Sequence, residues 1–144
     1  MPTEANKAIV RRFVEEGINQ ANESVFLDLL SPDVVDHYAR PGLPPGRAGW
    51  NLYRKLFRAA FPDGRWAIAS IIAEGDLVAA RASFTGTHQG EFLGIPPTGQ
   101  QVTVSVIHIC RLADGKIVER WVNSDELGML RQLGAIATPE QVAA

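Results

Sequence analysis

The sequence has little of several features that would assign it to a particular class of protein. It contains one cysteine in 144 residues, so no disulfide can form within the chain. Its net charge is only −2, and its lysines and arginines are scattered, so it lacks the basic patch of a nucleic-acid-binding protein. The longest apolar runs, such as VSVIHIC, are far shorter than the ~20 residues that span a bilayer. We therefore expect neither nucleic acid nor membrane as a partner.

Signals for export and for several kinds of chemistry are also missing. The first residues, MPTEANK, contain no basic segment followed by an apolar one, and with the lone Cys110 this predicts a cytoplasmic protein. No glycine-rich phosphate loop and no GxSxG motif occurs, which argues against nucleotide-dependent chemistry and against a serine hydrolase. Cys110 lies within a strand pattern without the electropositive setting of a nucleophile.

What the sequence does have is ordinary globular composition, with 46% apolar and 21% charged residues. A chain of this length buries roughly 68–70% of its unfolded surface, so it can form a core. Neither an internal repeat nor a linker divides it. We predict one domain over residues 1–144, with a core from about residue 4 to residue 134 and a tail at 135–144.

The first half of the chain has the periodicity of helices. Apolar residues recur every three or four positions from Thr3, and a second short helix follows Asn22 and stops at Ser31-Pro32. DVVDHY, at 33–38, predicts a short strand, and the Pro- and Gly-rich stretch after it predicts a loop. A third helix is expected from about residue 47 to residue 61, before Pro62.

After Pro62 the period becomes that of strands. We predict strands at 65–73, 77–88, 101–112 and 116–123, with turns at 74–76 and at Asp114-Gly115. A last helix, 126–133, ends at Gly134, the residue type favoured just past a helix end. Helices followed by an antiparallel meander and a terminal helix indicate an α+β fold, in which the helices cover one face of a curved antiparallel sheet.

The Asp114-Gly115 turn allows the strand register to be predicted. If these two residues form the whole loop, His108 faces Trp121 and Val106 faces Asn123. One face of the sheet then carries Val104, Val106, His108, Cys110, Glu119, Trp121, Asn123 and, if the strand stays extended, Asp125. About 13 Å separates Asp125 from Trp121 along the strand, so His108 and Asp125 are expected to flank a space.

Each of these residues has a structural explanation that stays open beside the functional one. Asp125 fits the N-cap of the last helix, His108 fits a hydrogen-bonded core histidine, and Trp121 fits a packing residue. His37 is as compatible with the surface as with a pocket. The three histidines lie on separate elements without ligand-type spacing, so we predict no metal site. An acid, one or two imidazoles and aromatic walls suit general acid–base chemistry on a bulky apolar molecule.

Three motifs resemble the SnoaL-like polyketide cyclases, also called ester cyclases. They are GIPPTG, the hairpin HICRLADGKI, and an aspartate nine residues before the glycine of LRQLG; the resemblance runs from about Asn6 to Gly134. This family belongs to the cystatin-like superfamily, with nuclear transport factor two and ketosteroid isomerase. The resemblance implies a cone-shaped barrel with a deep apolar cavity, no cofactor, a polyketide-like hydrophobic substrate, and a homodimer or higher homo-oligomer.

The resemblance also implies a mechanism and site residues. An aspartate at the position of Asp125 takes a proton from a carbon flanked by carbonyl groups, the enolate closes a ring by intramolecular aldol condensation, and a histidine at the position of His108 contacts the substrate. Burial would raise the pKa of such an aspartate toward the working pH. We accordingly predict Asp125 and His108 as catalytic residues. The predicted substrate-binding residues are Asp36, His37, Trp66, His88, Trp121 and Asn123.

Departures from the family pattern leave other readings open. Asp36 stands where antibiotic-pathway cyclases have asparagine, and Trp121 and Asn123 also differ, which puts the substrate in doubt. The Asp-Arg-Asp arrangement of limonene epoxide hydrolase is missing from the predicted sheet. A ketosteroid isomerase would need an oxyanion pair such as a buried tyrosine and an acid, but the two tyrosines, Tyr38 and Tyr53, lie in the first half of the chain. A non-catalytic hydrophobic pocket and a structural subunit that dimerises through its sheet remain alternatives.

Overall fold

The computed structural model describes residues 2–143. Its helices are α1 (Thr3–Arg12), the π-helix η1 (Phe13–Asn19), α2 (Glu23–Leu29), α3 (Gly46–Ala60), α4 (Glu126–Gln132) and α5 (Pro139–Ala143). Its strands are β1 (Leu30–Asp36), β2 (Arg65–Glu74), β3 (Leu77–Thr87), β4 (Gln101–Ala113) and β5 (Lys116–Ser124). The predicted α+β plan is confirmed, and the short α5 in the tail was not predicted. No helix among these residues is long and apolar enough to cross a membrane.

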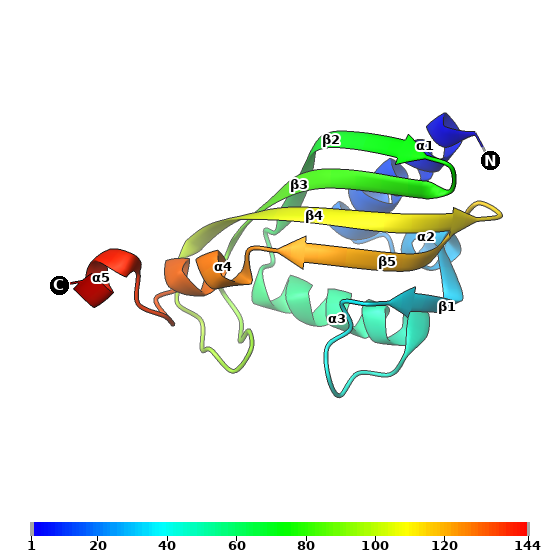
Figure 1. Cartoon of the computed structure of the whole chain (residues 1–144). Helices are drawn as coiled ribbons and strands as arrows, with labels where there is room; N and C mark the ends of the chain where they lie inside the picture. The colour runs from blue at the N-terminus through cyan, green and yellow to red at the C-terminus, as the bar shows by residue number, and fades with distance from the viewer. Residues whose placement is uncertain (1, 144) are drawn as a thin grey trace.

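The five strands form one sheet in the order β1-β5-β4-β3-β2 (Figure 1). The meander from β2 to β5 is antiparallel, as predicted, whereas β1 pairs with β5 in parallel and makes the sheet mixed. Strand β1 contains Pro32, which an edge strand tolerates because its outer side needs no ladder hydrogen bond. The edge position of β1 brings the loop that follows it next to α3 (Figure 1).

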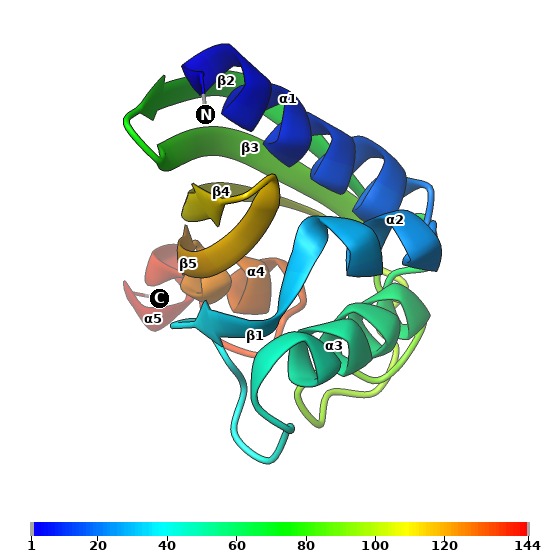
Figure 2. The ribbon, with the colours of Figure 1, turned by 90° about the vertical axis from the view of Figure 1, so that its right-hand side faces the viewer.

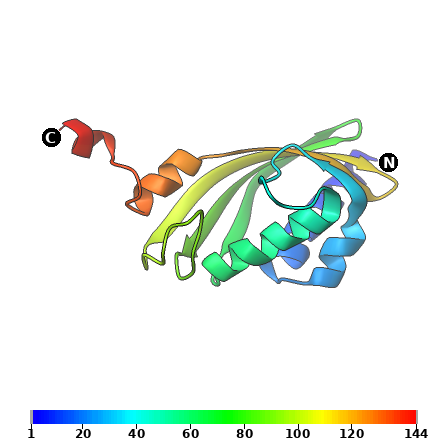
Figure 3. The same cartoon turned by 90° about the horizontal axis from the view of Figure 1, so that it is seen from below.

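The sheet is strongly curved, and the N-terminal helices close its concave side. In Figure 2, α1 lies over β2 and β3 while α3 lies beside β1, so the helices bridge the two edges of the curve. Figure 3 shows α3 running beneath the strands, with α4 and α5 beyond one end of the sheet. Two clusters of buried side chains fill the interior. One centres on Phe13, Phe26, Trp50 and Ile117, and the other on Phe61, Phe84, Val104 and Met129.

The β4–β5 hairpin contains a bulge that the sequence did not reveal. Asp114 and Gly115 both have positive φ, 52° and 76°, which confirms the predicted turn. The predicted pairing holds for the first two pairs, but the next pair is Arg111 with Glu119, so Val118 is an extra residue on β5. A shift of one residue turns every later side chain to the other face of a sheet.

The bulge makes the predicted register wrong for the rest of the hairpin. His108 pairs with Val122 rather than with Trp121, and Val106 pairs with Ser124 rather than with Asn123. The concave face of β5 therefore presents Arg120, Val122 and Ser124. Trp121 and Asn123 point to the convex face, so they do not share a face with His108.

Candidate functional site

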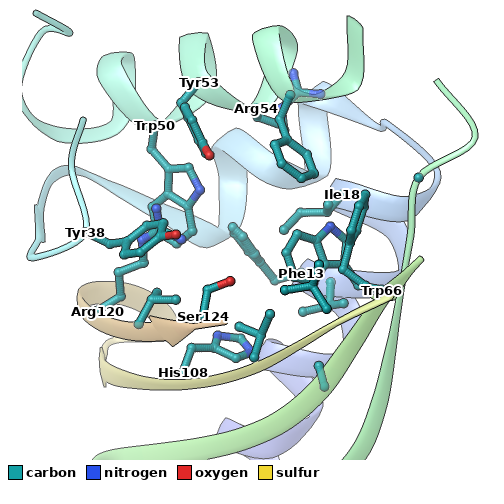
Figure 4. A pocket seen from close by; sticks show the side chains of 18 of the residues that line it. Phe13, Ile18, Tyr38, Trp50, Tyr53, Arg54, Trp66, His108, Arg120 and Ser124 are labelled. Carbon is teal, nitrogen blue, oxygen red and sulfur yellow. The ribbon is translucent and has the colours of Figure 1, made fainter. Parts of the chain in front are cut away.

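A cavity lies between the concave face of the sheet and the helices η1 and α3 (Figure 4). Its volume, with the open mouth included, is about 1230 Å³, and its walls are mainly apolar. Aromatic rings form much of the wall: Phe13, Trp50, Tyr53, Phe57, Phe61, Trp66, Phe84 and Phe92. Phe57 packs edge-on against Phe84 and Phe92 at centroid distances of 4.9 and 5.5 Å. Such walls suit a flat, bulky organic molecule.

The sheet contributes an imidazole to this cavity. His108, on β4, is one of the residues that line it, and its side chain rises from the sheet toward the helices (Figure 4). Burial, assisted by the nearby charge of Arg120, lowers the pKa of His108 to about 4. The imidazole is therefore neutral at physiological pH and free to accept a proton. Its Nδ1 lies 4.0 Å from the Sγ of the buried Cys110.

Arg120 is the second polar group on the sheet, and it is held by Asp36. Nε donates to Asp36 Oδ1 at 2.8 Å and Nη2 donates to Oδ2 at 3.0 Å. The two side chains are only 12% and 6% exposed. The guanidinium carbon lies 3.5 Å from the centroid of the Trp50 ring, which fixes the guanidinium from another side. Asp36, predicted to bind substrate, is thus the partner of a cavity arginine and is absent from the cavity wall itself.

Four side chains from three other segments form a polar cluster in the same wall. They are Tyr38 and Arg40 from the loop after β1, Tyr53 from α3, and Glu126 from α4. The Glu126 carboxylate accepts hydrogen bonds from Tyr38 Oη and from Arg40, whose Nη2 also donates to Tyr53 Oη at 3.3 Å. The cluster therefore ties the loop after β1 to the first turn of α4.

The protonation states of this cluster follow from burial and from its hydrogen bonds. Burial raises the pKa of Glu126, but the hydrogen bonds from Arg40 and Tyr38 outweigh burial and leave that pKa below its usual value. Burial also raises the pKa of both Tyr38 and Tyr53. The cavity thus holds an ionised carboxylate, paired with Arg40, and two phenols that stay protonated as hydrogen-bond donors.

Asp125 does not enter the cavity, so the prediction that its side chain leans inward is wrong. Its Oδ1 accepts a hydrogen bond from the amide of Gly128 at 2.9 Å, and the residue is the exposed N-cap of α4. Ser124 faces inward, so the strand alternation directs Asp125 outward, and Glu126 is the carboxylate that reaches the cavity. The N-cap predicted for Asp125 is confirmed, whereas its predicted catalytic role stays a prediction.

Three predicted substrate-binding residues lie on the convex side of the sheet or beyond its edge. The rings of His37 and Trp121 stack at a centroid distance of 5.0 Å and an interplanar angle of 8°. His37 Nε2 is 2.7 Å from a Glu119 carboxylate oxygen. Asn123 is exposed. All three are absent from the cavity wall. The predicted pocket positions of Trp121 and Asn123 are wrong because the bulge at Val118 reverses the facing of β5. His37 follows β1 and stacks on Trp121, which agrees with the surface position that the sequence left open.

Trp66 and His88 complete the predicted set. Trp66 lines the cavity, where its ring packs 4.7 Å from that of Phe84. His88 is fully buried outside the wall, and its Nδ1 accepts the amide hydrogen of Thr98 at 3.2 Å. Within residues 2–143, moreover, no three His, Cys, Asp or Glu side chains lie close enough together to hold a metal ion.

Several polar residues of the cavity wall were not predicted as site residues, among them Tyr38, Arg40, Tyr53, Arg120 and Glu126. Glu126 follows the inward-facing Ser124 by two positions, but the facing of Ser124 itself depends on the bulge. Tyr38 and Arg40 lie in an irregular segment whose direction no periodicity indicates. Arg120 became visible only with the bulge.

Comparison with known proteins places this arrangement in a family. Residues 8–133 match the family of SnoaL-like polyketide cyclases. The chain belongs to the SnoaL-like polyketide cyclase family. It is 40% identical over 130 residues to an aklanonic acid methyl ester cyclase of Streptomyces sp. strain C5, covering 88% of this chain and 80% of that protein. It is 32% identical over 117 residues to the nogalonic acid methyl ester cyclase of Streptomyces nogalater, covering 81% and 84%.

Solved structures give the same assignment of fold. This SnoaL-like chain superposes on AclR, a candidate hydroxylase from Streptomyces galilaeus, with a TM-score of 0.84 and 32% sequence identity, covering 99% of this chain and 88% of AclR. The expected cone-shaped SnoaL-like fold is therefore confirmed. The named relatives are ester cyclases, whereas AclR is described as a candidate hydroxylase, so proteins of this fold are assigned more than one chemistry.

Proposed function

We propose that this SnoaL-like protein is an ester cyclase that closes a carbon ring in a polyketide methyl ester by an intramolecular aldol reaction. The observation that carries the proposal is the neutral imidazole of His108 within an aromatic-walled cavity. Aklanonic and nogalonic acid methyl esters are the substrates named for its relatives. Flat molecules of this class match a cavity whose walls are built from aromatic rings.

The reaction begins with a proton transfer. His108 accepts the proton of a substrate carbon that lies between two carbonyl groups, and the carbon–hydrogen electron pair becomes an enolate. A free-state pKa near 4 makes this imidazole a weak base. The enolate formed beside it supplies a negative charge that raises the pKa of His108 during the step, because an adjacent opposite charge favours the protonated form.

Ring closure follows within the same cavity. The enolate carbon attacks a second carbonyl carbon of the same molecule, the new carbon–carbon bond forms, and the carbonyl oxygen becomes an alkoxide. The imidazolium of His108 returns its proton to this alkoxide, so the enzyme ends in its initial state. The protonated phenol of Tyr53, whose oxygen accepts from Arg40, is available to donate to a substrate oxygen, whereas the Tyr38 hydroxyl already donates to Glu126. Walls that hold a flexible chain folded reduce the entropic part of the barrier.

Asp125 is the competing assignment for the acid–base group. The resemblance to characterised cyclases gives this role to an aspartate at its position, but its carboxylate is exposed and bonded to the amide of Gly128. The cavity carboxylate, Glu126, is engaged by Arg40 and Tyr38, and these bonds make it a poorer base. His108 is therefore the proton acceptor that the geometry favours.

The proposal is tested with aklanonic and nogalonic acid methyl esters as substrates. Cyclised product, separated by chromatography and identified by mass, is expected from the wild-type protein. His108→Gln is expected to lower kcat about 100- to 10,000-fold, the usual contribution of a general acid–base group. Gln89→Ala, at an exposed position outside the cavity, is the matched control and should leave kcat unchanged. Full turnover by His108→Gln would assign the proton transfer to another group.

The assembly and location of the protein stay predictions. The family resemblance predicts a homodimer or higher homo-oligomer, and the sequence predicts a single domain in the cytoplasm. Sedimentation of the full chain would measure the first of these directly.

A further inference from the structure

Arg120 is a buried cation whose position is set by two other side chains. Asp36 holds two of its nitrogens, and the Trp50 ring covers the guanidinium at 3.5 Å. Asp36 is itself fixed, because its Oδ1 also accepts the amide hydrogen of Tyr38 at 2.9 Å. Within the part of the chain that the structure describes, Nη1 of Arg120 makes no hydrogen bond, although Arg120 lines the cavity.

Stability alone is a weak reason for such an arrangement. Moving an ion pair out of water costs about as much as the pair regains, and well-packed apolar residues usually serve a fold equally well. Here the arrangement holds a guanidinium with one unbonded nitrogen in the wall of a mainly apolar cavity. A low-dielectric cavity strengthens the attraction between such a cation and any anion formed inside it.

The sheet register brings Arg120 close to the proposed base. Arg120 pairs with Cys110, and His108 is two residues before Cys110 on the same face of β4. Diagonal neighbours of this kind lie roughly 7–8 Å apart at their Cα atoms, within reach of a long side chain. Figure 4 shows Arg120 and His108 rising from neighbouring strands on the same side of the sheet, with Ser124 between them.

The other three arginines of the cavity wall are already bound by neighbouring groups, which makes them less suited to stabilise an anion formed in the cavity. Arg40 is paired with Glu126, which is itself in the wall and would repel an anion. Arg54 is bound by Glu23 and Asn51. Arg58 donates to the backbone carbonyl oxygens of Ile18, Asn19, Pro62 and Gly64. Only Arg120 among the four lies on the sheet beside His108.

We propose that Arg120 is a catalytic residue that donates a hydrogen bond from Nη1 to the enolate oxygen formed when His108 takes the substrate proton. Asp36 and Trp50 are positioning residues that hold the guanidinium in the required orientation. The inference rests on the proposed ring closure and names the group that stabilises its anionic intermediate. No electron or atom is exchanged with Arg120, which remains protonated throughout.

The first test uses 2-naphthol, a flat probe whose neutral and anionic forms differ in absorbance and fluorescence, and it needs no turnover. Wild-type protein should raise the ionisation constant of bound 2-naphthol about 10- to 100-fold, as expected for a charge-assisted hydrogen bond. Asp36→Asn should raise it at least as much, because the asparagine oxygen can still accept one hydrogen bond that orients Arg120, while the negative charge that offsets Arg120 is removed. The double variant Asp36→Asn/Arg120→Gln should lose most of the effect, and it avoids leaving Asp36 buried without a partner.

The matched control is Arg111→Gln, which removes a guanidinium from the convex face of the same hairpin, where it is bonded to Asp76 and Glu119. It should leave the probe unaffected. A merely structural role for Arg120 predicts that Asp36→Asn and the double variant, once shown by circular dichroism to be folded, behave alike. Equal probe ionisation in those two variants, or a wild-type protein that does not take up or ionise 2-naphthol, would overturn the proposal.

The second test uses the methyl esters. The kcat of the folded double variant should be about 100- to 1,000-fold below that of the wild type, the usual effect of removing one oxyanion donor, and KM should change less. Arg111→Gln should match the wild type. Unchanged kcat in the double variant would refute the role of Arg120. If the wild type turns over neither ester, the proposed substrates fail, and the naphthol experiment still decides whether Arg120 stabilises an oxyanion in this cavity.

Discussion

The environment of His108 predicts a specific dependence of stability on pH. The folded protein lowers the pKa of His108 from an ordinary 6.5 to about 4, chiefly through burial. Between these values the unfolded chain binds a proton at His108 and the folded chain does not. Lowering the pH from 6.5 toward 4 therefore favours the unfolded state, and this penalty is complete below the folded pKa. Above pH 6.5 the group is neutral in both states and has no effect.

The size of the effect follows from the shift. A difference of one pKa unit corresponds to about 1.4 kcal/mol, so a shift of about 2.5 units gives about 3.5 kcal/mol at most. Each pH unit within the window should cost about 1.4 kcal/mol of unfolding free energy. His108→Gln cannot bind this proton, so its stability should lack this part of the pH dependence while keeping the contributions of every other titrating group.

The assay is urea unfolding of wild type and His108→Gln at several pH values from 7.5 down to the lowest at which both fold reversibly. The difference between their unfolding free energies should be constant above pH 6.5. It should then move by about 1.4 kcal/mol per pH unit in favour of the variant as the pH falls. Parallel stability curves through this window would show that His108 titrates near its ordinary value and is not desolvated, which would refute the reasoning.

Two further predictions concern tightly packed positions of the fold. Burial raises the pKa of the Cys110 thiol to about 12. A disulfide reagent such as 5,5′-dithiobis(2-nitrobenzoate) at pH 8 should therefore leave the folded protein unmodified and titrate one thiol in denaturant. Rapid reaction of the folded protein would contradict the burial. A Cβ at Gly90 would lie 2.4 Å from the carbonyl oxygen of Ala59, so Gly90→Ala should lower the unfolding free energy by about 1–3 kcal/mol. The control Gln89→Ala, at an exposed position, should change the unfolding free energy little. Equal stability of the two variants would show that the backbone at Gly90 moves easily away from Ala59.

The elements were predictable from the sequence because local chemistry defines their ends. Asn22 accepts the amide hydrogen of Val25 at 3.3 Å and starts α2, and Asp114-Gly115 supplies the positive φ angles that the tight turn requires. The change of hydrophobic period after Pro62 separates helices from strands. These signals involve residues close in sequence, so they survive without knowledge of the tertiary structure.

The site was less predictable because one residue reverses a whole strand. A turn signal fixes only the first pairs of a hairpin, and the bulge at Val118 shifts every pair after them. The bulge places Arg120 and Ser124 in the cavity wall, where the predicted register had placed Trp121 and Asn123. His108 was placed correctly as a residue of the concave face because it lies on β4, which has no bulge, although its predicted partner was wrong.

Tertiary placement of irregular backbone accounts for the other missed residues. Tyr38 and Arg40 follow the last residue of β1, and they reach the cavity because β1 lies at the sheet edge beside α3. The parallel pairing of β1 with β5, which no local signal indicated, puts Asp36 opposite Arg120. Arg120 and its partner Asp36 therefore come from strands that the sequence alone did not pair.

The most direct measurement for the central claim, that ring closure occurs in the cavity at His108, compares the kcat of Asp125→Asn with that of His108→Gln on aklanonic acid methyl ester. Asparagine preserves the N-cap of α4, so the first variant should fold normally. We predict that Asp125→Asn keeps nearly full kcat while His108→Gln loses at least 100-fold. Loss of turnover in folded Asp125→Asn, with turnover retained in His108→Gln, would contradict the account.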